Sequence, residues 1–170
     1  GAARARLRQA GIKACFFIQF GYPGETFDDI MATVRLVREA LPDNIGVSVS
    51  YPLPGTKFYE MVRQQLGAKT HWTASGDLAM MFQGTYETPF YRRLHHLLHE
   101  DLDLRRKLAA IQPSTENQQP AHDVLADLDR LNAAWFELGR MEQHHRAAAP
   151  TVLLRQNGHL PVPDLSKDWN

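Results

Sequence analysis

The sequence of 170 residues predicts an α/β fold, with a partial parallel-sheet unit over residues 1–67 and a mainly helical extension after it. Three observations support this prediction. The short apolar run Ile12–Phe20 is typical of a strand buried on both faces. A second strand is indicated at 45–51, where apolar residues alternate with glycine and serine. Between the two, apolar residues recur at helical spacing from Phe27 to Leu41.

Capping residues, glycine and proline mark the ends of the predicted helices. Segment 2–10 is rich in alanine and arginine, and its helix is expected to end at Gly11. Thr26 is a favourable N-cap for the second helix, which Pro42 ends. A third helix is expected after the turn at 52–56. Strand and helix therefore alternate, which implies parallel strands joined by right-handed crossovers.

The rest of the chain is expected to be helical, with loops between the helices. Residues 68–111 predict a loop followed by a long helix over 90–111, and residues 112–121 are a polar linker. The last segment, 122–170, predicts a helix over 122–149 and then an irregular tail. The helix carries one apolar stripe, formed by Val124, Leu125, Leu128, Leu131, Trp135, Leu138 and Met141.

Composition excludes several classes of function. The chain has 19 basic and 19 acidic side chains, so its formal net charge is zero. Neither nucleic acid nor an anionic membrane is therefore an expected partner. The longest apolar run, Ala14–Phe20, is too short to span a bilayer, and the opening residues do not predict a signal peptide. The expected location is cytoplasmic.

Two strands do not make a stable sheet alone, because their apolar faces need further strands. This predicts that the chain is a fragment of a larger domain. The missing initiator methionine fits a fragment, and equally a processed or a trimmed chain. Cys15 is the only cysteine, which excludes an internal disulfide and an iron–sulfur cluster held by this chain alone. Its position within the first strand predicts a small buried core residue.

Histidines give the only pattern that suits a metal ion. His95 and His99 share one face of a predicted helix, at a spacing that allows both to bind one ion. No third ligand is evident, so no metal site is predicted. A zinc-binding regulator built on these histidines is an alternative that the sequence leaves open.

Two loops rich in glycine and proline follow the predicted strands. Gly21–Thr26 and Pro52–Thr56 both fall where parallel strands end, which is where ligands bind in parallel α/β folds. Glycine lets a ligand approach the backbone closely, and proline holds a turn rigid. Both residues are also common at such turns for structural reasons alone. Neither loop carries a glycine-rich phosphate-binding motif.

The segments GIKACFFIQFGYPGETFDDI (11–30) and VSVSYPLPGTKFYE (47–60) resemble two consecutive strand–loop units of radical S-adenosylmethionine (SAM) enzymes. They are most similar to the branch that often carries a cobalamin-binding domain. That branch includes the anaerobic magnesium-protoporphyrin IX monomethyl ester oxidative cyclase and related methyltransferases. Segments 72–86 and 90–105 resemble its C-terminal extension. In all, the resemblance covers about residues 1–106.

The resemblance implies the C-terminal part of a (β/α)6 partial TIM barrel, packed on the missing N-terminal part of that barrel. SAM would lie across the carboxyl ends of the strands. A 4Fe–4S cluster would be held by a CxxxCxxC motif upstream of this chain, and cobalamin would be a further cofactor where the parent protein has that domain. The expected SAM contacts are Gln19, Gly21, Tyr22, Glu25, Tyr51, Pro52 and Leu53.

Two of these residues, Gln19 and Glu25, differ from a simple SAM contact. Gln19 stands where many relatives have isoleucine, which argues against an apolar adenine contact there. Glu25 has an alternative role within its own turn, accepting hydrogen bonds from backbone N–H groups. The resemblance identifies no catalytic residue in this chain.

The implied function is that of the C-terminal part of a radical SAM enzyme, an oxidative cyclase or methyltransferase acting on a small molecule. This chain alone is expected to be inactive, because its cluster ligands lie elsewhere. The alternative is a non-catalytic helical interaction module with a remnant α/β segment. In that case the stripe over 124–141 would pack against a partner helix.

Overall fold

The computed structural model describes residues 2–66, 78–111 and 119–148. In chain order the elements are α1 (Ala2–Gln9), β1 (Cys15–Phe20), α2 (Phe27–Ala40), β2 (Asn44–Val49), α3 (Lys57–Val62), the 3-10 helix η1 (Arg63–Gln65), α4 (Thr88–Ala110) and α5 (Gln119–Ala148). The predicted α/β class is confirmed, with helices making up most of the described chain.

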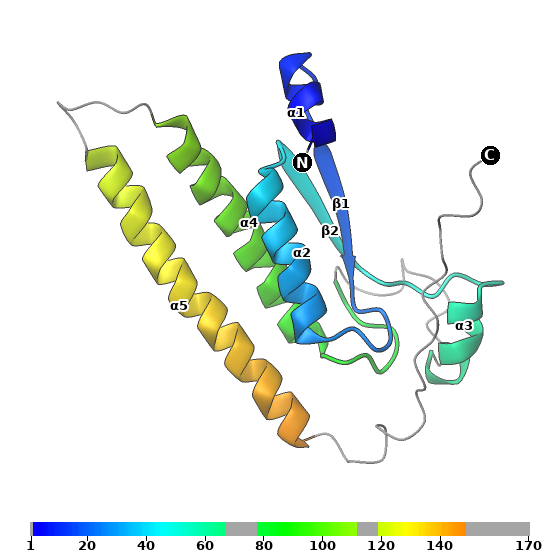
Figure 1. The fold of residues 1–170 in the computed structure, drawn as a ribbon. Coiled ribbons are helices and arrows are strands. Elements are labelled where there is room, and N and C mark those ends of the chain that lie inside the picture. Colours follow the sequence, from blue (N-terminus) through cyan, green and yellow to red (C-terminus); the bar gives the residue numbers. More distant parts are fainter. Residues whose placement is uncertain (1, 67–77, 112–118, 149–170) are drawn as a thin grey trace.

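The two strands lie side by side and run parallel, with α2 as the connection between them. The register pairs Cys15 with Asn44 at one end and Phe20 with Val49 at the other. Figure 1 shows α2, α4 and α5 together on one side of the strands, and α3 reached by the loop that leaves β2. Both carboxyl ends therefore meet at one edge, where the two predicted loops begin.

Local capping chemistry sets the bounds of α2. Thr26 accepts a hydrogen bond from the backbone N–H of Asp29, and the Asp29 carboxylate accepts one in return from the Thr26 backbone N–H. This reciprocal capping box confirms Thr26 as the N-cap. The helix ends at Leu41, which adopts the left-handed conformation with φ of 44° and donates its N–H to the Val37 carbonyl.

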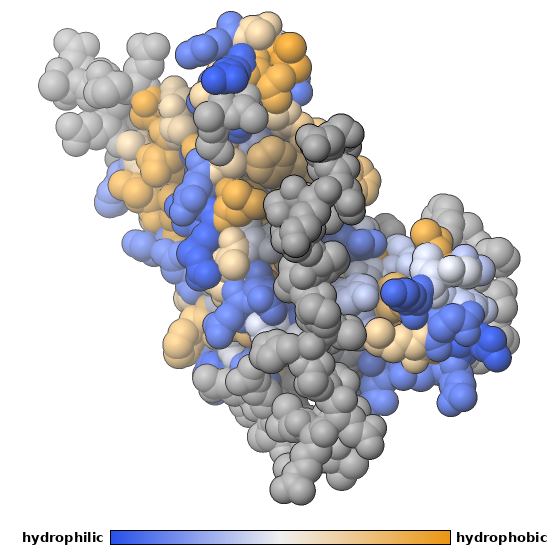
Figure 2. Space-filling view, turned by 45° about the vertical axis from the view of Figure 1, so that its right-hand side comes forward, coloured by the Kyte–Doolittle hydropathy of each residue, from blue (hydrophilic) through white to orange (hydrophobic). Residues whose placement is uncertain are grey.

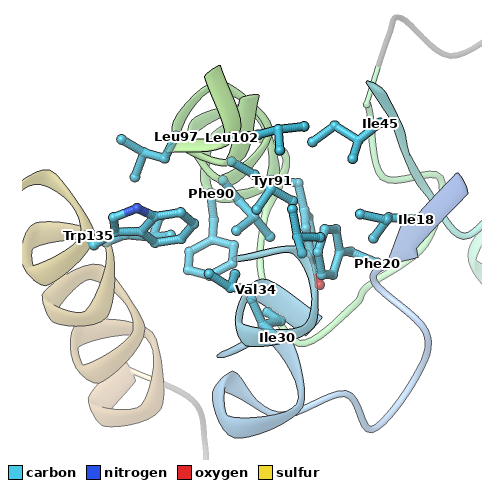
Figure 3. Close-up of a cluster of buried hydrophobic side chains, with 14 of the residues drawn as sticks. Ile18, Phe20, Ile30, Val34, Ile45, Phe90, Tyr91, Leu97, Leu102 and Trp135 are labelled. Atoms are coloured by element: carbon cyan, nitrogen blue, oxygen red, sulfur yellow. The ribbon is translucent and has the colours of Figure 1, made fainter. Parts of the chain in front are cut away.

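One apolar core joins the strands to three helices. Figure 3 shows Ile18 of β1, Val34 of α2, Phe90 of α4 and Trp135 of α5 directed toward a common centre. A smaller cluster joins the α3 region to the loop before α4, and consists of Val62, Leu66, Met81 and Phe82. The main core crosses the boundary predicted at 67/68, so the α/β unit and the helices of the extension pack as one body.

A buried carboxylate ties these three helices together. Asp101 of α4 is 1% exposed and accepts a hydrogen bond from Nε of Arg38 on α2 at 2.9 Å. Its carboxylate also accepts from Nε1 of Trp135 on α5 at 2.9 Å, and from Arg105 one turn along α4. The Arg38 guanidinium lies 5.4 Å from the Trp135 ring centroid, a cation–π distance. The three residues that donate to Asp101 thus come from three different helices.

One face of β1 departs from the prediction of a strand buried on both sides. Cys15, Phe17 and Gln19 are exposed, whereas Ile18 and Phe20 are buried against the helices. Phe17 is 88% exposed, and its ring lies over Gly46 of β2. Cys15 is exposed as well, so the prediction of a buried core cysteine is wrong for this structure. Its side chain points to the face that no described helix covers.

The apolar stripe of α5 is buried within the chain itself. Leu128, Leu131, Trp135 and Leu138 belong to the main core, and α5 packs along α4. A partner helix therefore has no access to the centre of this stripe, which contradicts the use of it that the interaction-module alternative requires. Of the predicted stripe, Leu125 and Met141 are exposed, at 48% and 36%.

The linker predicted over 112–121 is shorter than expected, because α5 already begins at Gln119. Pro120 occupies the second position of this helix, where the missing N–H of proline costs no hydrogen bond. Residues 112–118 and the tail over 150–170 lie outside the described residues, as do residues 68–77 of the loop predicted before α4.

Replacing Asp101 with asparagine is expected to lower the free energy of unfolding by about 3 kcal/mol, because two arginines would lose their buried counter-charge. Asp103, exposed on the same helix, is the matched control, and its replacement with asparagine is expected to change stability by no more than about 0.5 kcal/mol. Urea unfolding of both variants measures the difference. Equal midpoints for the two variants would contradict the role given to Asp101.

Candidate functional site

The exits of the two strands lie next to each other, as the sequence predicted. The backbone N–H of Ser50 donates to the Phe20 carbonyl at 2.7 Å, which continues the parallel pairing past β2. One loop further out, the rings of Tyr22 and Phe58 meet with centroids 5.0 Å apart. The loop after β1 and the helix after β2 are therefore in direct contact at the carboxyl edge of the sheet.

The seven residues expected to contact SAM all lie at this edge, but they differ in exposure. Gln19, Tyr22 and Leu53 are exposed, with Tyr22 at 48% and Leu53 at 57%. Glu25 and Tyr51 are partly buried, and Gly21 and Pro52 are buried. A molecule approaching this edge therefore meets the amide of Gln19, the phenol of Tyr22 and the apolar side chain of Leu53 first.

Glu25 closes the first loop on itself. Its Oε2 atom accepts a hydrogen bond from the Gly21 backbone N–H at 2.8 Å, and the Glu25 N–H donates to the Tyr22 carbonyl at 3.0 Å. The alternative role predicted for Glu25, bonding within its own turn, is thus what the structure places there. The same oxygen also lies 3.4 Å from the hydroxyl of Tyr91 on α4.

The environment of Glu25 raises the pKa of its carboxyl to about 7. Desolvation by burial is the main cause, and the negative charge of Asp29 adds to it. The hydrogen bonds from Gly21 and Tyr91 act in the opposite direction, because they favour the carboxylate. Glu25 is thus a group that exchanges its proton near neutral pH, at the edge where the strands end.

Gly21 is packed from behind by residues of the extension. It has φ of 80°, a conformation that favours glycine, and a Cβ atom there would lie 3.2 Å from Met80 and 3.3 Å from the Tyr91 ring. Sequence reasoning did not assign Met80 or Tyr91 to this edge. Tyr91 reads as one more apolar residue of a helical stripe, and only the tertiary packing brings its hydroxyl to Glu25.

The uncovered face of the sheet continues from this edge. In the observed register Phe17 pairs with Gly46 and Gln19 with Ser48, so these four residues share the side opposite the helices. Figure 2 shows hydrophobic residues, in orange, reaching the surface below α1 at the top of the view. The face combines one large apolar ring with small and polar neighbours.

An iron–sulfur cluster does not fit the residues of this chain. Cys15 is the first residue of β1, at the amino end of the strand, whereas the two loops lie at the carboxyl end. Such clusters need three or four thiolates. Any cluster that works at the carboxyl edge must take its ligands from outside this sequence.

His95 and His99 lie side by side on α4. The rings of His95 and His99 have centroids 4.4 Å apart, and burial together with His95 lowers the pKa of His99. Among the residues that the structure describes, no three His, Cys, Asp or Glu side chains gather where they could hold a metal ion.

Comparison with protein-family models, with curated proteins and with solved structures finds no match for this chain. Within residues 2–66, 78–111 and 119–148, no helix is long and apolar enough to cross a membrane.

Replacing Gly21 with alanine is expected to destabilise the chain more than replacing Gly24 with alanine. Both glycines have positive φ, 80° and 89°, so both variants incur the backbone strain of roughly 1 kcal/mol. Only at Gly21 does the new methyl group meet packed side chains, since nothing lies within 4 Å of a Cβ at Gly24. The expected excess is about 1–2 kcal/mol in urea unfolding; equal losses would show that Met80 and Tyr91 do not pack there.

The raised pKa of Glu25 predicts a pH dependence of stability. Between the ordinary value of 4.5 and about 7, the folded chain binds this proton and the unfolded chain does not. The free energy of unfolding should therefore fall as pH rises through this window, and the Glu25→Gln variant should lack that part of the fall. Urea melts at pH 4.5, 5.5, 6.5 and 7.5 measure it. Parallel curves for the two proteins would exclude the shift.

Proposed function

We propose that this chain is the C-terminal part of a radical SAM enzyme of the branch that often carries a cobalamin domain, and that its carboxyl edge forms one wall of the SAM pocket. The observation that carries the proposal is the contact between Tyr22 in the loop after β1 and Phe58 of α3, with Gln19 and Leu53 exposed at the same edge. In parallel α/β folds this edge is where ligands bind.

The chemistry of the edge suits the adenosyl part of SAM. Tyr22 and Leu53 offer an aromatic ring and an aliphatic surface to a purine, and the Gln19 amide offers both a donor and an acceptor to its edge. In this proposal the Gln19 amide forms hydrogen bonds with the edge of the purine, where isoleucine would make an apolar contact. Tyr51, which is partly buried, extends the same wall toward β2.

The open face of the sheet supports a barrel that continues beyond these two strands. Phe17 is 88% exposed on the side opposite α2, which is the side that faces the interior when such strands close into a barrel. Burying this ring would stabilise the parent protein by about 2 kcal/mol. We therefore propose that the N-terminal part of the barrel covers it.

The cluster of the parent enzyme would supply the electron that cleaves SAM. The residues of this chain do other work in the proposal: they orient the adenosyl group, shield it from water and hold a proton on Glu25 near neutral pH. The substrate is proposed to be a small molecule.

A site-resolved binding experiment tests the wall. Because one wall gives only weak affinity, on the order of 1 mM, 5′-deoxyadenosine is added at millimolar concentration to the isotopically labelled chain. Backbone NMR shifts are expected to concentrate at Gln19, Gly21, Tyr22 and 51–53. The Leu53→Asp variant, at an exposed position, should lose these shifts while keeping the rest of its spectrum.

Uridine at the same concentration is the ligand control. Shifts of equal size with uridine, or shifts confined to other elements, would contradict an adenosyl wall. Independently, the reading frame upstream of Gly1 is expected to encode a CxxxCxxC motif within about 200 residues. A start codon directly before Gly1 would contradict the enzyme proposal.

A further inference from the structure

The loop after β1 is held by a residue of the helical extension as well as by its own turn. Oε2 of Glu25 receives two donors, the Gly21 N–H at 2.8 Å and the Tyr91 hydroxyl at 3.4 Å. The ring of the same tyrosine fills the space behind Gly21, 3.3 Å from where a Cβ would stand. One side chain of α4 therefore contacts both the backbone at the start of the loop and the carboxylate at its end.

The position of Tyr91 is itself well fixed. The residue is 1% exposed, and its ring meets Phe90 edge-on at 5.5 Å and Tyr86 at 6.1 Å between centroids. Burial and the nearby Glu25 raise the pKa of the Tyr91 phenol, so the hydroxyl keeps its proton and remains a donor at neutral pH. Asp29, at the start of α2, is the other charged group that acts on Glu25.

We propose that Tyr91 is a positioning residue for the loop at 21–25: its hydroxyl fixes the Glu25 carboxylate against the Gly21 N–H, and its ring backs Gly21. Helix α4 thereby sets the conformation of a wall that Tyr91 itself does not line. The inference rests on the proposed function for the identity of the ligand, and on contacts within this chain for the positioning.

The test variant is Tyr91→Phe, which keeps the ring and removes the hydroxyl. Tyr59→Phe is the matched control, since Tyr59 lies on α3 and is not among the groups bonded to Glu25. Two readouts are taken on the whole chain: the titration of the Glu25 carboxyl carbon by NMR, assigned with Glu25→Gln, and the hydrogen-exchange rate of the Gly21 amide.

In the wild type the Glu25 carboxyl is expected to titrate near pH 7. Tyr91→Phe should move this midpoint upward, because the carboxylate loses a donor, and should speed exchange of the Gly21 amide roughly tenfold. Tyr59→Phe should change neither. A Tyr91→Phe protein with the midpoint and exchange rate of the wild type overturns the inference.

Ligand binding separates this inference from the proposed function. If the wild type does not bind 5′-deoxyadenosine, the SAM wall is refuted, while titration and exchange still decide the role of Tyr91. If the wild type binds, Tyr91→Phe should weaken binding several-fold. Should Tyr91→Phe fail to fold, Glu25→Asp is tested in its place, because it shortens the carboxylate and leaves the Tyr91 ring in the core. An unchanged hydrogen-exchange rate of the Gly21 amide in Glu25→Asp would again overturn the inference.

Discussion

The arrangement of this chain depends on the hydrogen bonds that converge on Asp101. A buried carboxylate is costly unless donors surround it, and here the donors come from α2, from α4 and from α5. Apolar packing alone specifies a less unique arrangement of helices. A buried charged group requires its partners at fixed positions, so Asp101 specifies how the three helices are placed.

Helix α4 connects Asp101 to the candidate site. Asp101 lies nearly three turns along the helix from Tyr91, which reaches the first loop. The loop at the carboxyl edge is thus held by α4 as well as by α2, which begins where the loop ends. This explains why the extension is part of the site although none of the residues expected at the ligand belongs to it.

Local chemistry was sufficient to predict both strands and the start of α2. Thr26 acts as the N-cap, and the alternation after Asn44 marks β2, because these signals involve neighbours in sequence. Exposure was harder to predict. The apolar composition of β1 indicates a strand buried on both faces, and only the packing shows that Phe17 and Cys15 lie on an uncovered one. Glu25 and Tyr91 are 66 positions apart in the sequence. Hydrophobic periodicity relates residues within one helix or strand, so it could not predict this contact.

The capping box of α2 has an effect outside the helix it begins. Hydrogen bonds from Thr26 lower the pKa of Asp29, so this carboxylate stays ionised over the whole range in which Glu25 gains or loses its proton. The negative charge that starts α2 therefore also opposes ionisation of Glu25, four residues earlier. The Asp29 carboxylate therefore both stabilises the start of α2 and raises the pKa of Glu25. A mutation at Asp29 is expected to change both properties together.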